Sequence, residues 1–409
     1  MPKVEKNVPE LRFKGFSDPW EQRKLGEVID NQYNGQTPSR TNASFWNGEI
    51  NWLSSGELNR GVVSETIEKI TEDGRKNANL KIVPKGTFVM AITGLEAAGT
   101  RGNCAKLGID TTMNQSCMAL FPKKKLLDSS FLFQWYRKVG EEYGLQYTQG
   151  TKQQSYNAEL LKILPIVLPS VSEQVLIADF FDKIDDTIAL HQRKLTLLEQ
   201  LKQTYLQVMF PQGKESIPKL RFTDHSEPWE QRKLGEVGSV VMCKRIFKDQ
   251  TTAFGDIPFY KIGTFGGSPD SFIPNDLFEE YKKNYPYPEI GDILMSASGT
   301  IGRTVVYEGE KAYYQDSNIV WLKTDKSLID NSFLKQFYQV VKWSGLEGST
   351  IKRLYNSNIL STGINLPSLR EQTKLGTFFN QIDNTIALHQ KKIAHLKALK
   401  STLLNKMFI

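Results

Sequence analysis

Six polar segments that combine Arg or Lys with Gln, Asn, Ser and Thr are the part of this sequence best suited to chemistry with another molecule. Cations bind phosphates, and planar amides and guanidinium groups bind base edges in the major groove, so this mixture predicts contact with duplex DNA. Solvated surface loops are the alternative for any single segment, but segments of one kind recur at three matching places in both halves of the chain. They are Gly35–Arg40, Gly99–Asn103, Gln149–Asn157, Cys243–Lys248, Ser296–Arg303 and Glu347–Asn356.

The candidate DNA-binding residues are polar side chains within or near these segments. In the first half they are Gln36, Thr37, Ser39, Arg40, Thr93, Arg101, Asn103, Thr151, Lys152, Gln153 and Gln154. In the second half they are Lys244, Arg245, Lys261, Ser296, Ser298, Thr300, Arg303, Ser349, Thr350, Lys352 and Arg353.

Motifs that would make the chain an enzyme are missing from the sequence. It has no G-x-x-x-x-G-K-[ST] phosphate loop, no G-x-G-x-x-G turn and no Asn-Pro-Pro-aromatic tetrapeptide of an adenine methyltransferase. Asp182, Asp185 and Asp186 are interpreted as a solvated helix face. The four histidines suggest no metal site, so we expect no catalytic residue, no metal and no bound cofactor. A stand-alone methyltransferase or nuclease, and a two-module scaffold for protein or RNA, stay open as alternatives.

Composition sets wider limits. The net charge of +7 is compatible with a polyanionic partner, although many unrelated proteins carry a similar charge. No apolar run approaches a membrane span, and the first residues lack the apolar stretch of a signal peptide. We therefore expect a cytoplasmic protein without a membrane partner. The three widely spaced cysteines are expected to be buried thiols.

A long internal repeat organises the chain. The decapeptide PWEQRKLGEV stands at Pro19–Val28 and again at Pro228–Val237, and Leu168–Phe210 aligns without a gap on Leu366–Phe408, with 23 of 43 pairs identical. In the decapeptide, Trp20 and Trp229 are expected to anchor packing, and short helices are expected to begin at Leu25 and Leu234. The predicted organisation is a domain over 1–167, a helix over 168–210, a linker and second domain over 211–365, and a helix over 366–409.

Each repeated helix begins with a capping-box spacing, Ser170 with Glu173 and Ser368 with Glu371. A regular apolar stripe follows, typical of a coiled-coil seam. Because the chain must return between the copies, the two helices are expected to lie antiparallel and bury each other's stripes. The first copy carries six acidic and four basic residues and the second two acidic and seven basic, so their opposite net charges favour pairing. The predicted seam residues are Ile177, Phe181, Ile184, Ile188, His191, Leu195, Leu198, Leu375, Phe379, Ile382, Ile386, His389, Ile393 and Leu396.

The two seam histidines, His191 and His389, are interpreted as polar residues that fix the register of the helices; a pH switch or a ligand-binding pair is the alternative. Between the repeats, short strands are expected at Gly86–Ile92, Ser116–Leu120, Gly291–Ala297 and Asn318–Leu322, and amphipathic helices at Ser129–Val139 and Asn331–Val341. The fold class is therefore α+β: two mixed α/β domains related by a pseudo-twofold repeat and separated by two long antiparallel coiled-coil helices.

The order of these parts resembles the DNA specificity subunit of type I restriction–modification systems. The resemblance rests on KLGEV, on GQTPSR followed by GEINWL, on VPKGTFVMAITG, on GTKQQSYN and on LPSVSEQ followed by FFDKIDDTIALHQ, and it covers essentially the whole chain. It implies two target-recognition domains that each read one half of a bipartite, asymmetric DNA target. It also implies that the helices set the gap and bind two modification (methyltransferase) subunits, and that two restriction subunits join them. S-adenosylmethionine, ATP and Mg would then belong to those partners.

One departure from the resemblance concerns the second half. Nothing there matches GQTPSR, and Val240–Lys248 reads VVMCKRIFK instead. The departure leaves the DNA role of this loop open in at least one half.

Overall fold

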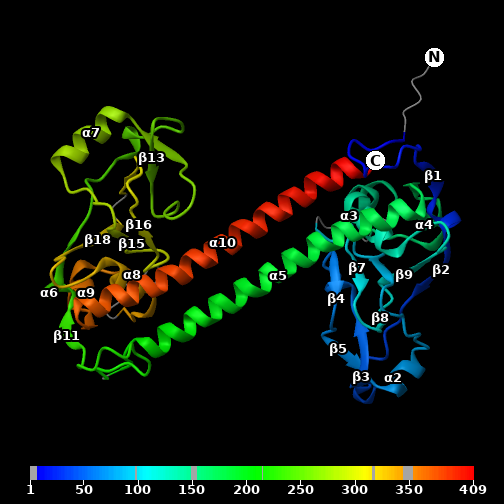
Figure 1. Ribbon diagram of the computed structural model, residues 1–409, viewed down its shortest axis with the longest axis horizontal. Helices are drawn as coiled ribbons and strands as arrows, with labels where there is room; N and C mark the ends of the chain where they lie inside the picture. The colour runs from blue at the N-terminus through cyan, green and yellow to red at the C-terminus, as the bar shows by residue number, and fades with distance from the viewer. Residues whose placement is uncertain (1–6, 97–98, 149–153, 214, 316–317, 344–352) are drawn as a thin grey trace. The chain divides into compact units, whose positions relative to one another are not determined.

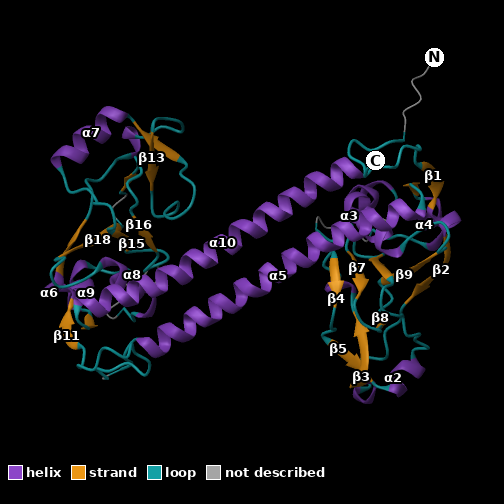
Figure 2. Ribbon diagram, viewed as in Figure 1, coloured by secondary structure: helices purple, strands orange, loops and turns teal. Residues whose placement is uncertain are grey.

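The computed structural model describes residues 7–409 except 97–98, 149–153, 214, 316–317 and 344–352. The chain divides into two compact units (Figure 1). Unit 1 comprises Met1–Gln192 with Lys391–Ile409, and unit 2 comprises Arg193–Gln390. Each unit combines sheets with helices, as the α+β prediction requires (Figure 2). The two units are described one after the other.

Unit 1 is built on a five-stranded sheet in the order β2-β9-β6-β7-β4, with a three-stranded sheet β5-β3-β8 and a two-stranded ladder β1-β10. Its shorter helices are α1 (Leu25–Val28), α2 (Glu72–Asn77), α3 (Ser129–Gln146) and α4 (Ala158–Ile163). Its strands are β1 (Glu21–Lys24), β2 (Ile29–Asn34), β3 (Trp46–Leu53), β4 (Gly61–Val63), β5 (Glu68–Ile70), β6 (Phe88–Ala91), β7 (Cys104–Leu107), β8 (Thr112–Met113), β9 (Cys117–Pro122) and β10 (Pro165–Leu168).

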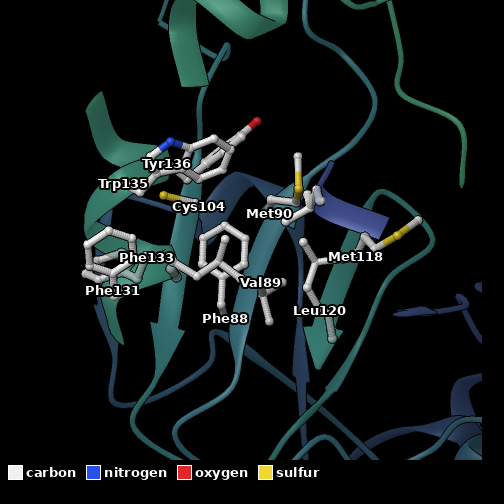
Figure 3. Close-up of a cluster of buried hydrophobic side chains, with 14 of the residues drawn as sticks. Phe88, Val89, Met90, Cys104, Met118, Leu120, Phe131, Phe133, Trp135 and Tyr136 are labelled. Carbon is white, nitrogen blue, oxygen red and sulfur yellow. The ribbon is translucent and has the colours of Figure 1, made fainter. Parts of the chain in front are cut away.

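The centre of the large sheet is buried on both faces. All four residues of β6 are buried, as are the first four of β9. Because both faces of these strands are covered, their sequences are continuous apolar runs. Helix α3 packs against β6 and β7, and its aromatic residues join the core (Figure 3). The predicted strands at Gly86–Ile92 and Ser116–Leu120 thus correspond to β6 and β9, whereas α3 is longer than the predicted Ser129–Val139.

In its described residues, unit 2 repeats this plan with a smaller central sheet. A four-stranded sheet runs β12-β18-β15-β16, beside a three-stranded sheet β14-β13-β17 and a ladder β11-β19. Its shorter helices are α6 (Leu234–Val237), α7 (Asn275–Asn284), α8 (Asn331–Val340) and α9 (Asn356–Ser361). Its strands are β11 (Glu230–Lys233), β12 (Gly238–Val241), β13 (Ile257–Tyr260), β14 (Ser271–Ile273), β15 (Ile293–Ser296), β16 (Thr304–Val306), β17 (Tyr313–Tyr314), β18 (Ile319–Thr324) and β19 (Gly363–Leu366).

The repeated decapeptide forms the same structure in both units. It supplies β1 and α1 in unit 1 and β11 and α6 in unit 2, so the short helices begin at Leu25 and Leu234 as predicted. Trp20 is buried and makes edge contacts with Phe131 and Phe408 at 6.1 and 6.3 Å between ring centroids. Trp229 makes the equivalent contacts with Phe333 and Phe210. The prediction that both tryptophans anchor packing is confirmed.

Two helices of 39 residues, α5 (Val171–Met209) and α10 (Leu369–Met407), follow the repeated Leu-Pro-Ser sequences. Only one half of each predicted capping box forms. The Ser170 hydroxyl accepts a bond from the Glu173 N–H at 3.4 Å, and Ser368 does the same for Glu371. The two glutamate side chains do not return to the cap. Each is buried and bound through both oxygens by an arginine, Arg12 for Glu173 and Arg221 for Glu371, because the preceding segment of each repeat packs there.

Segments of α5 and α10 lie antiparallel within each unit. In unit 1, Phe181 of α5 meets Phe408, and Asp185, further along α5, pairs with Lys400, which comes earlier in the chain. In unit 2, Tyr205 contacts Phe378 and Lys202 pairs with Asp383 at 2.6 Å. Later residues of α5 contact earlier residues of α10, so the antiparallel arrangement is confirmed.

The prediction of a solvated aspartate face was wrong for two of its three members. Asp182 pairs with Lys106 at 2.9 Å, and Asp185 pairs with Arg137 at 2.5 Å as well as with Lys400. Only Asp186 is exposed. The acidic side of α5 faces α3 and the end of α10, so it holds elements together.

Candidate nucleic-acid interface

The polar segments of unit 1 converge at one end of its five-stranded sheet. Strand β2 ends at Asn34 opposite Met118, and β6 ends at Ala91 opposite Cys117, so the segments that follow both strands leave the sheet together. The third segment joins them through a bridge between Thr93 and Ser155. We name the described parts of these segments, 35–40, 93–96, 99–103 and 154–157, loop surface 1.

Hydrogen bonds to its backbone hold the segment Gly35–Arg40 in place. The Gln36 N–H donates to the Met113 carbonyl at 2.9 Å, and the Gln36 carbonyl accepts from the Trp52 indole at 3.0 Å. The Trp46 indole donates to the Ser39 carbonyl at 3.0 Å. Gln36 and Ser39 are exposed, whereas the Thr37 hydroxyl is bound to the side chain of Gln115. The Ser39 hydroxyl is hydrogen-bonded to that of Thr41 at 2.8 Å, so the backbone is fixed while the Gln36 side chain remains available to a ligand.

Arg40 is committed to neighbours inside the protein. Its guanidinium lies 3.8 Å from the Trp46 ring centroid and 4.9 Å from that of Trp52. It binds both oxygens of Glu68, at 2.5 and 2.9 Å. This hydrogen bonding raises the pKa of Arg40 and lowers the pKa of Glu68.

The other segments of loop surface 1 are also bound internally. Arg101 donates to the Glu96 carbonyl at 2.7 Å, and the Leu95 N–H donates to the Gln154 carbonyl at 3.1 Å. The side chains of Thr93, Arg101, Asn103 and Gln154 are partly buried. Thr151, Lys152 and Gln153 lie outside the described residues.

Unit 2 brings its polar segments together in the same way. Strand β12 ends at Val241 opposite Trp321, β15 ends at Ser296 opposite Ile319, and a bridge joins Ser298 to Arg353. We name the described parts, 243–248, 296–303 and 353–356, loop surface 2. Lys244 and Arg245 are exposed, with their cations over the rings of Tyr285 and Phe247 at 5.0 and 5.3 Å.

Several predicted residues of unit 2 have partners within the protein. Ser296 and Ser298 are buried, and the Ser296 hydroxyl donates to the Thr300 carbonyl and accepts from the Arg303 N–H. The Arg303 guanidinium donates to the Phe265 carbonyl at 2.9 Å. Lys261 pairs with Asp270 at 2.8 Å and lowers the pKa of that carboxyl group. Thr300 and Arg353 are exposed. Ser349, Thr350 and Lys352 lie outside the described residues, and DNA contact stays a prediction for all these positions.

The predicted seam residues differ in burial along the two long helices. Ile177, Phe181, Leu195, Leu375, Phe379 and Ile393 are buried. Ile184, Ile188, His191, Leu198, Ile382, Ile386, His389 and Leu396 are partly buried. Four of the six buried residues lie near the first turns, where each helix joins the core of its unit, whereas Leu195 and Ile393 are buried near the middle of α5 and α10.

Other chemistry has little support in the described part of the chain. No group of three His, Cys, Asp or Glu side chains there is placed to hold a metal ion. Burial raises the pKa of Cys104 and of Cys243 to about 12 and also raises that of Cys117, so the three thiols are buried and protonated near neutral pH. Within the described residues, no helix has the length and apolarity needed to cross a membrane.

The residues that hold the polar loops in place were not identified from the sequence. Trp46, Trp52 and Glu68 hold the first segment, and Tyr313 and Gln315 hold Cys243–Lys248. Two tryptophans six residues apart in one strand are expected on the same face, which is the one sequence signal that could have revealed the first pair. No comparable spacing marks the second set.

Known proteins show where this arrangement occurs. A chain provisionally named a type I restriction enzyme specificity subunit, from Haemophilus influenzae, is 40% identical over 260 residues, which cover 64% of this chain and about two thirds (66%) of that one. A type I restriction enzyme specificity subunit from Methanocaldococcus jannaschii is 24% identical over 95% of this chain and 92% of its own length. The crystal structure of the S subunit of a type I restriction–modification system from M. genitalium shares the fold, with a TM-score of 0.68, 15% identity and coverage of 98% of this chain and 99% of that chain.

A family model extends the likeness to both halves. The type I restriction modification DNA specificity domain matches residues 17–200 and again residues 226–398, which is the repeat seen in the sequence and in the two units. Because these two matches cover most of the chain, it belongs to the family of type I restriction–modification DNA specificity subunits.

Proposed function

We propose that this chain is a non-catalytic subunit that recognises a bipartite DNA sequence, with unit 1 reading one half-site and unit 2 the other. The observation that carries the proposal is that each unit has one such surface, loop surface 1 in unit 1 and loop surface 2 in unit 2. Each gathers three polar segments at the corresponding end of the central sheet in one copy of the repeated specificity domain. Two independent surfaces of unlike sequence suit an asymmetric target.

The helices α5 and α10 are proposed to set the gap between the half-sites and to bind two modification subunits, with two restriction subunits completing the complex. Each long helix continues from one unit into the other, so its length is available as a spacer. S-adenosylmethionine, ATP and Mg are assigned to the partner subunits. A complex that acts on cellular DNA would work in the cytoplasm.

The experiment is to assemble the full chain with its modification subunits, to methylate a genomic library and to sequence the modified positions. We expect one bipartite motif with an unspecified gap. Exchanging residues 29–167 for the corresponding part of another family member should change one half of that motif and leave the other half unchanged. A motif that changed in both halves would contradict the division between the units.

The two alternatives predict different results. A stand-alone methyltransferase would transfer methyl groups from S-adenosylmethionine to DNA without any other subunit, and a stand-alone nuclease would cut DNA by itself. A protein or RNA scaffold would give an assembled complex that binds duplex DNA without sequence preference.

A further inference from the structure

We propose that Trp46, Trp52 and the Arg40–Glu68 pair are positioning residues that fix the backbone of Gly35–Arg40, so that the Gln36 side chain reads a base edge and Arg40 does not. This inference rests on the proposed function of unit 1. It changes the role predicted for Arg40 and adds three residues to the recognition surface.

The first step concerns the direction of the backbone. An indole N–H can only donate, so each tryptophan fixes the carbonyl that it meets. Trp52 holds the carbonyl of Gln36 and Trp46 holds that of Ser39, both at 3.0 Å. Between these points stands buried Pro38, which restricts the preceding residue to extended conformations. The turn is therefore fixed at both of its ends.

The second step concerns the rigidity of the two anchors. Trp52 is buried with Ile70 and Leu80 in a small core of its own. Its ring meets that of Trp46 edge to face, with 5.1 Å between centroids and an interplanar angle of 87°. Both rings belong to β3, so the loop is held by a sheet. The neighbours of β3 in that sheet are β5 and β8 (Figure 2).

The third step concerns Arg40. To present both terminal nitrogens to a guanine, its guanidinium would have to leave both oxygens of Glu68 and shift from the two tryptophan rings. Glu68 lies on β5, so the ion pair ties the end of the loop to the same small sheet. The side chain of Arg40 is still 53% exposed, so the inference that it orders the loop and does not bind a phosphate or a guanine rests on its contacts with Glu68 and the two rings.

The fourth step concerns the side chain that remains. Gln36 is exposed, and its amide has no hydrogen-bond partner among the described residues, whereas its own N–H and carbonyl are both bound. A planar amide on an immobilised backbone can form the paired bonds that an adenine edge offers in the major groove. Immobilisation matters because recognition depends on placement to within about 0.5 Å.

Unit 2 holds its own segment by the same means with different residues. The Tyr313 hydroxyl donates to the Lys244 carbonyl at 2.9 Å, and the Gln315 amide donates to the Cys243 carbonyl at 3.0 Å. Tyr313 lies on β17, which pairs in parallel with β13, as β8 pairs with β3 in unit 1. The segment without GQTPSR therefore keeps the anchoring although it lacks the motif.

The test uses the full chain assembled with its modification subunits and the variants Trp46→Phe, Trp52→Phe and Tyr313→Phe, which keep a ring and lose a donor. Binding is measured on the native target and on targets with single base changes in either half-site. We expect each Trp variant to lose discrimination roughly tenfold at one half-site and to keep it at the other. Tyr313→Phe should show the reverse. Trp20→Phe is the matched control, because its indole has no hydrogen-bond partner among the described residues.

Arg40 is tested by its salt dependence and by combination. If Arg40 bound a phosphate, Arg40→Gln would reduce the slope of log affinity against log salt by about one, whereas removing a positioning residue leaves the slope unchanged. In a Trp46→Phe/Trp52→Phe background, Arg40→Gln should cause no further loss of discrimination. Glu68→Gln should resemble the Trp variants, although it frees Arg40 for DNA.

The outcomes separate this inference from the proposed function. Trp variants that discriminate as the wild type does would overturn the positioning role and leave recognition by two units intact. Trp variants that lose discrimination at both half-sites would overturn the positioning role and also contradict the division between the units. An additive loss for Arg40→Gln would restore Arg40 as a reader. A wild-type complex without sequence preference would remove the proposed function itself. The unaffected half-site reports folding of the complex in every variant.

Discussion

Two buried carboxylates show how single residues join the repeat to its helices. Glu173 is fully buried and is bound through both oxygens by Arg12, and Glu371 is bound in the same way by Arg221. Each glutamate sits in the first turn of a long helix, and each arginine precedes the repeated decapeptide. A buried, bidentate ion pair constrains geometry closely, and removing one partner leaves the other charge uncompensated.

Glu173→Gln is therefore expected to destabilise unit 1 by about 3 kcal/mol, because Arg12 would keep its charge in a largely buried place and lose the carboxylate that binds it, with only the weaker interaction with Asp18 left. Urea unfolding followed by circular dichroism measures the change. The control is Glu199→Gln on the exposed side of the same helix, which should change the free energy of unfolding by less than about 0.5 kcal/mol. Equal stabilities of the two variants would show that the buried pair contributes nothing.

At the scale of elements, a pair of charges repeats across the two long helices. Asp185 of α5 pairs with Lys400 of α10 in unit 1, and Lys202 of α5 pairs with Asp383 of α10 in unit 2. The second copy of the repeat lies 198 residues after the first, so Asp383 corresponds to Asp185 and Lys400 corresponds to Lys202. The two ion pairs are therefore equivalent in the repeat. Each helix thus contributes one acid and one base, and both pairs favour the same antiparallel register.

Lys400 makes this contact sensitive to pH. Burial, aided by the nearby Arg137 and opposed by Asp185 and Asp182, lowers the pKa of Lys400 from 10.5 to about 8. Folding then releases a proton between about pH 8 and pH 10.5, so the free energy of unfolding should rise with pH in that window, by up to about 1.4 kcal/mol per unit. Urea unfolding at several pH values should show this rise in the wild type relative to Lys400→Met. Lys397→Met, on the exposed side of α10, should behave as the wild type; a missing difference would contradict the lowered pKa.

At the scale of the molecule, the helices suggest where the spacing between half-sites can be changed. Asp185 and Lys202 are 17 residues apart in α5, and so are Asp383 and Lys400 in α10. Insertions within both segments would leave the ion pairs and cores of each unit intact. The midpoint region is therefore the place to alter the spacer without altering either recognition surface.

Inserting one heptad at corresponding places in both helices, between Leu195 and Lys202 in α5 and between Asp383 and Leu388 in α10, adds about 10 Å of helix. At about 3.4 Å per base pair, the unspecified gap in the methylated motif should lengthen by about three base pairs, with both half-sites unchanged. Methylome sequencing with the modification subunits present measures it. The same insertion in α5 alone should break the register and destabilise the protein. A change in either half-site would refute the spacer role.

Local patterns were enough to predict much of this architecture. The repeat, with the starts of α1 and α6 inside it, follows from sequence identity, and the buried strands β6, β9, β15 and β18 follow from apolar runs. The two long helices follow from apolar periodicity and serine caps, and their antiparallel direction from the return of the chain between the copies. The polar segments were also found from composition alone, because charged and amide residues cluster there. Whether each of these residues contacts DNA remains a prediction.

What the sequence by itself determined was the doubled α+β plan and the position of its polar loops, because helix and strand periods and turn residues act over short distances. Only the tertiary structure decided which charges have partners. Arg40 meets Glu68 across 28 residues, Arg12 meets Glu173 across 161, and Asp185 meets Lys400 across 215. No local period encodes such pairs, so a sequence shows an arginine in a loop or an aspartate on a helix without showing that packing has already engaged it.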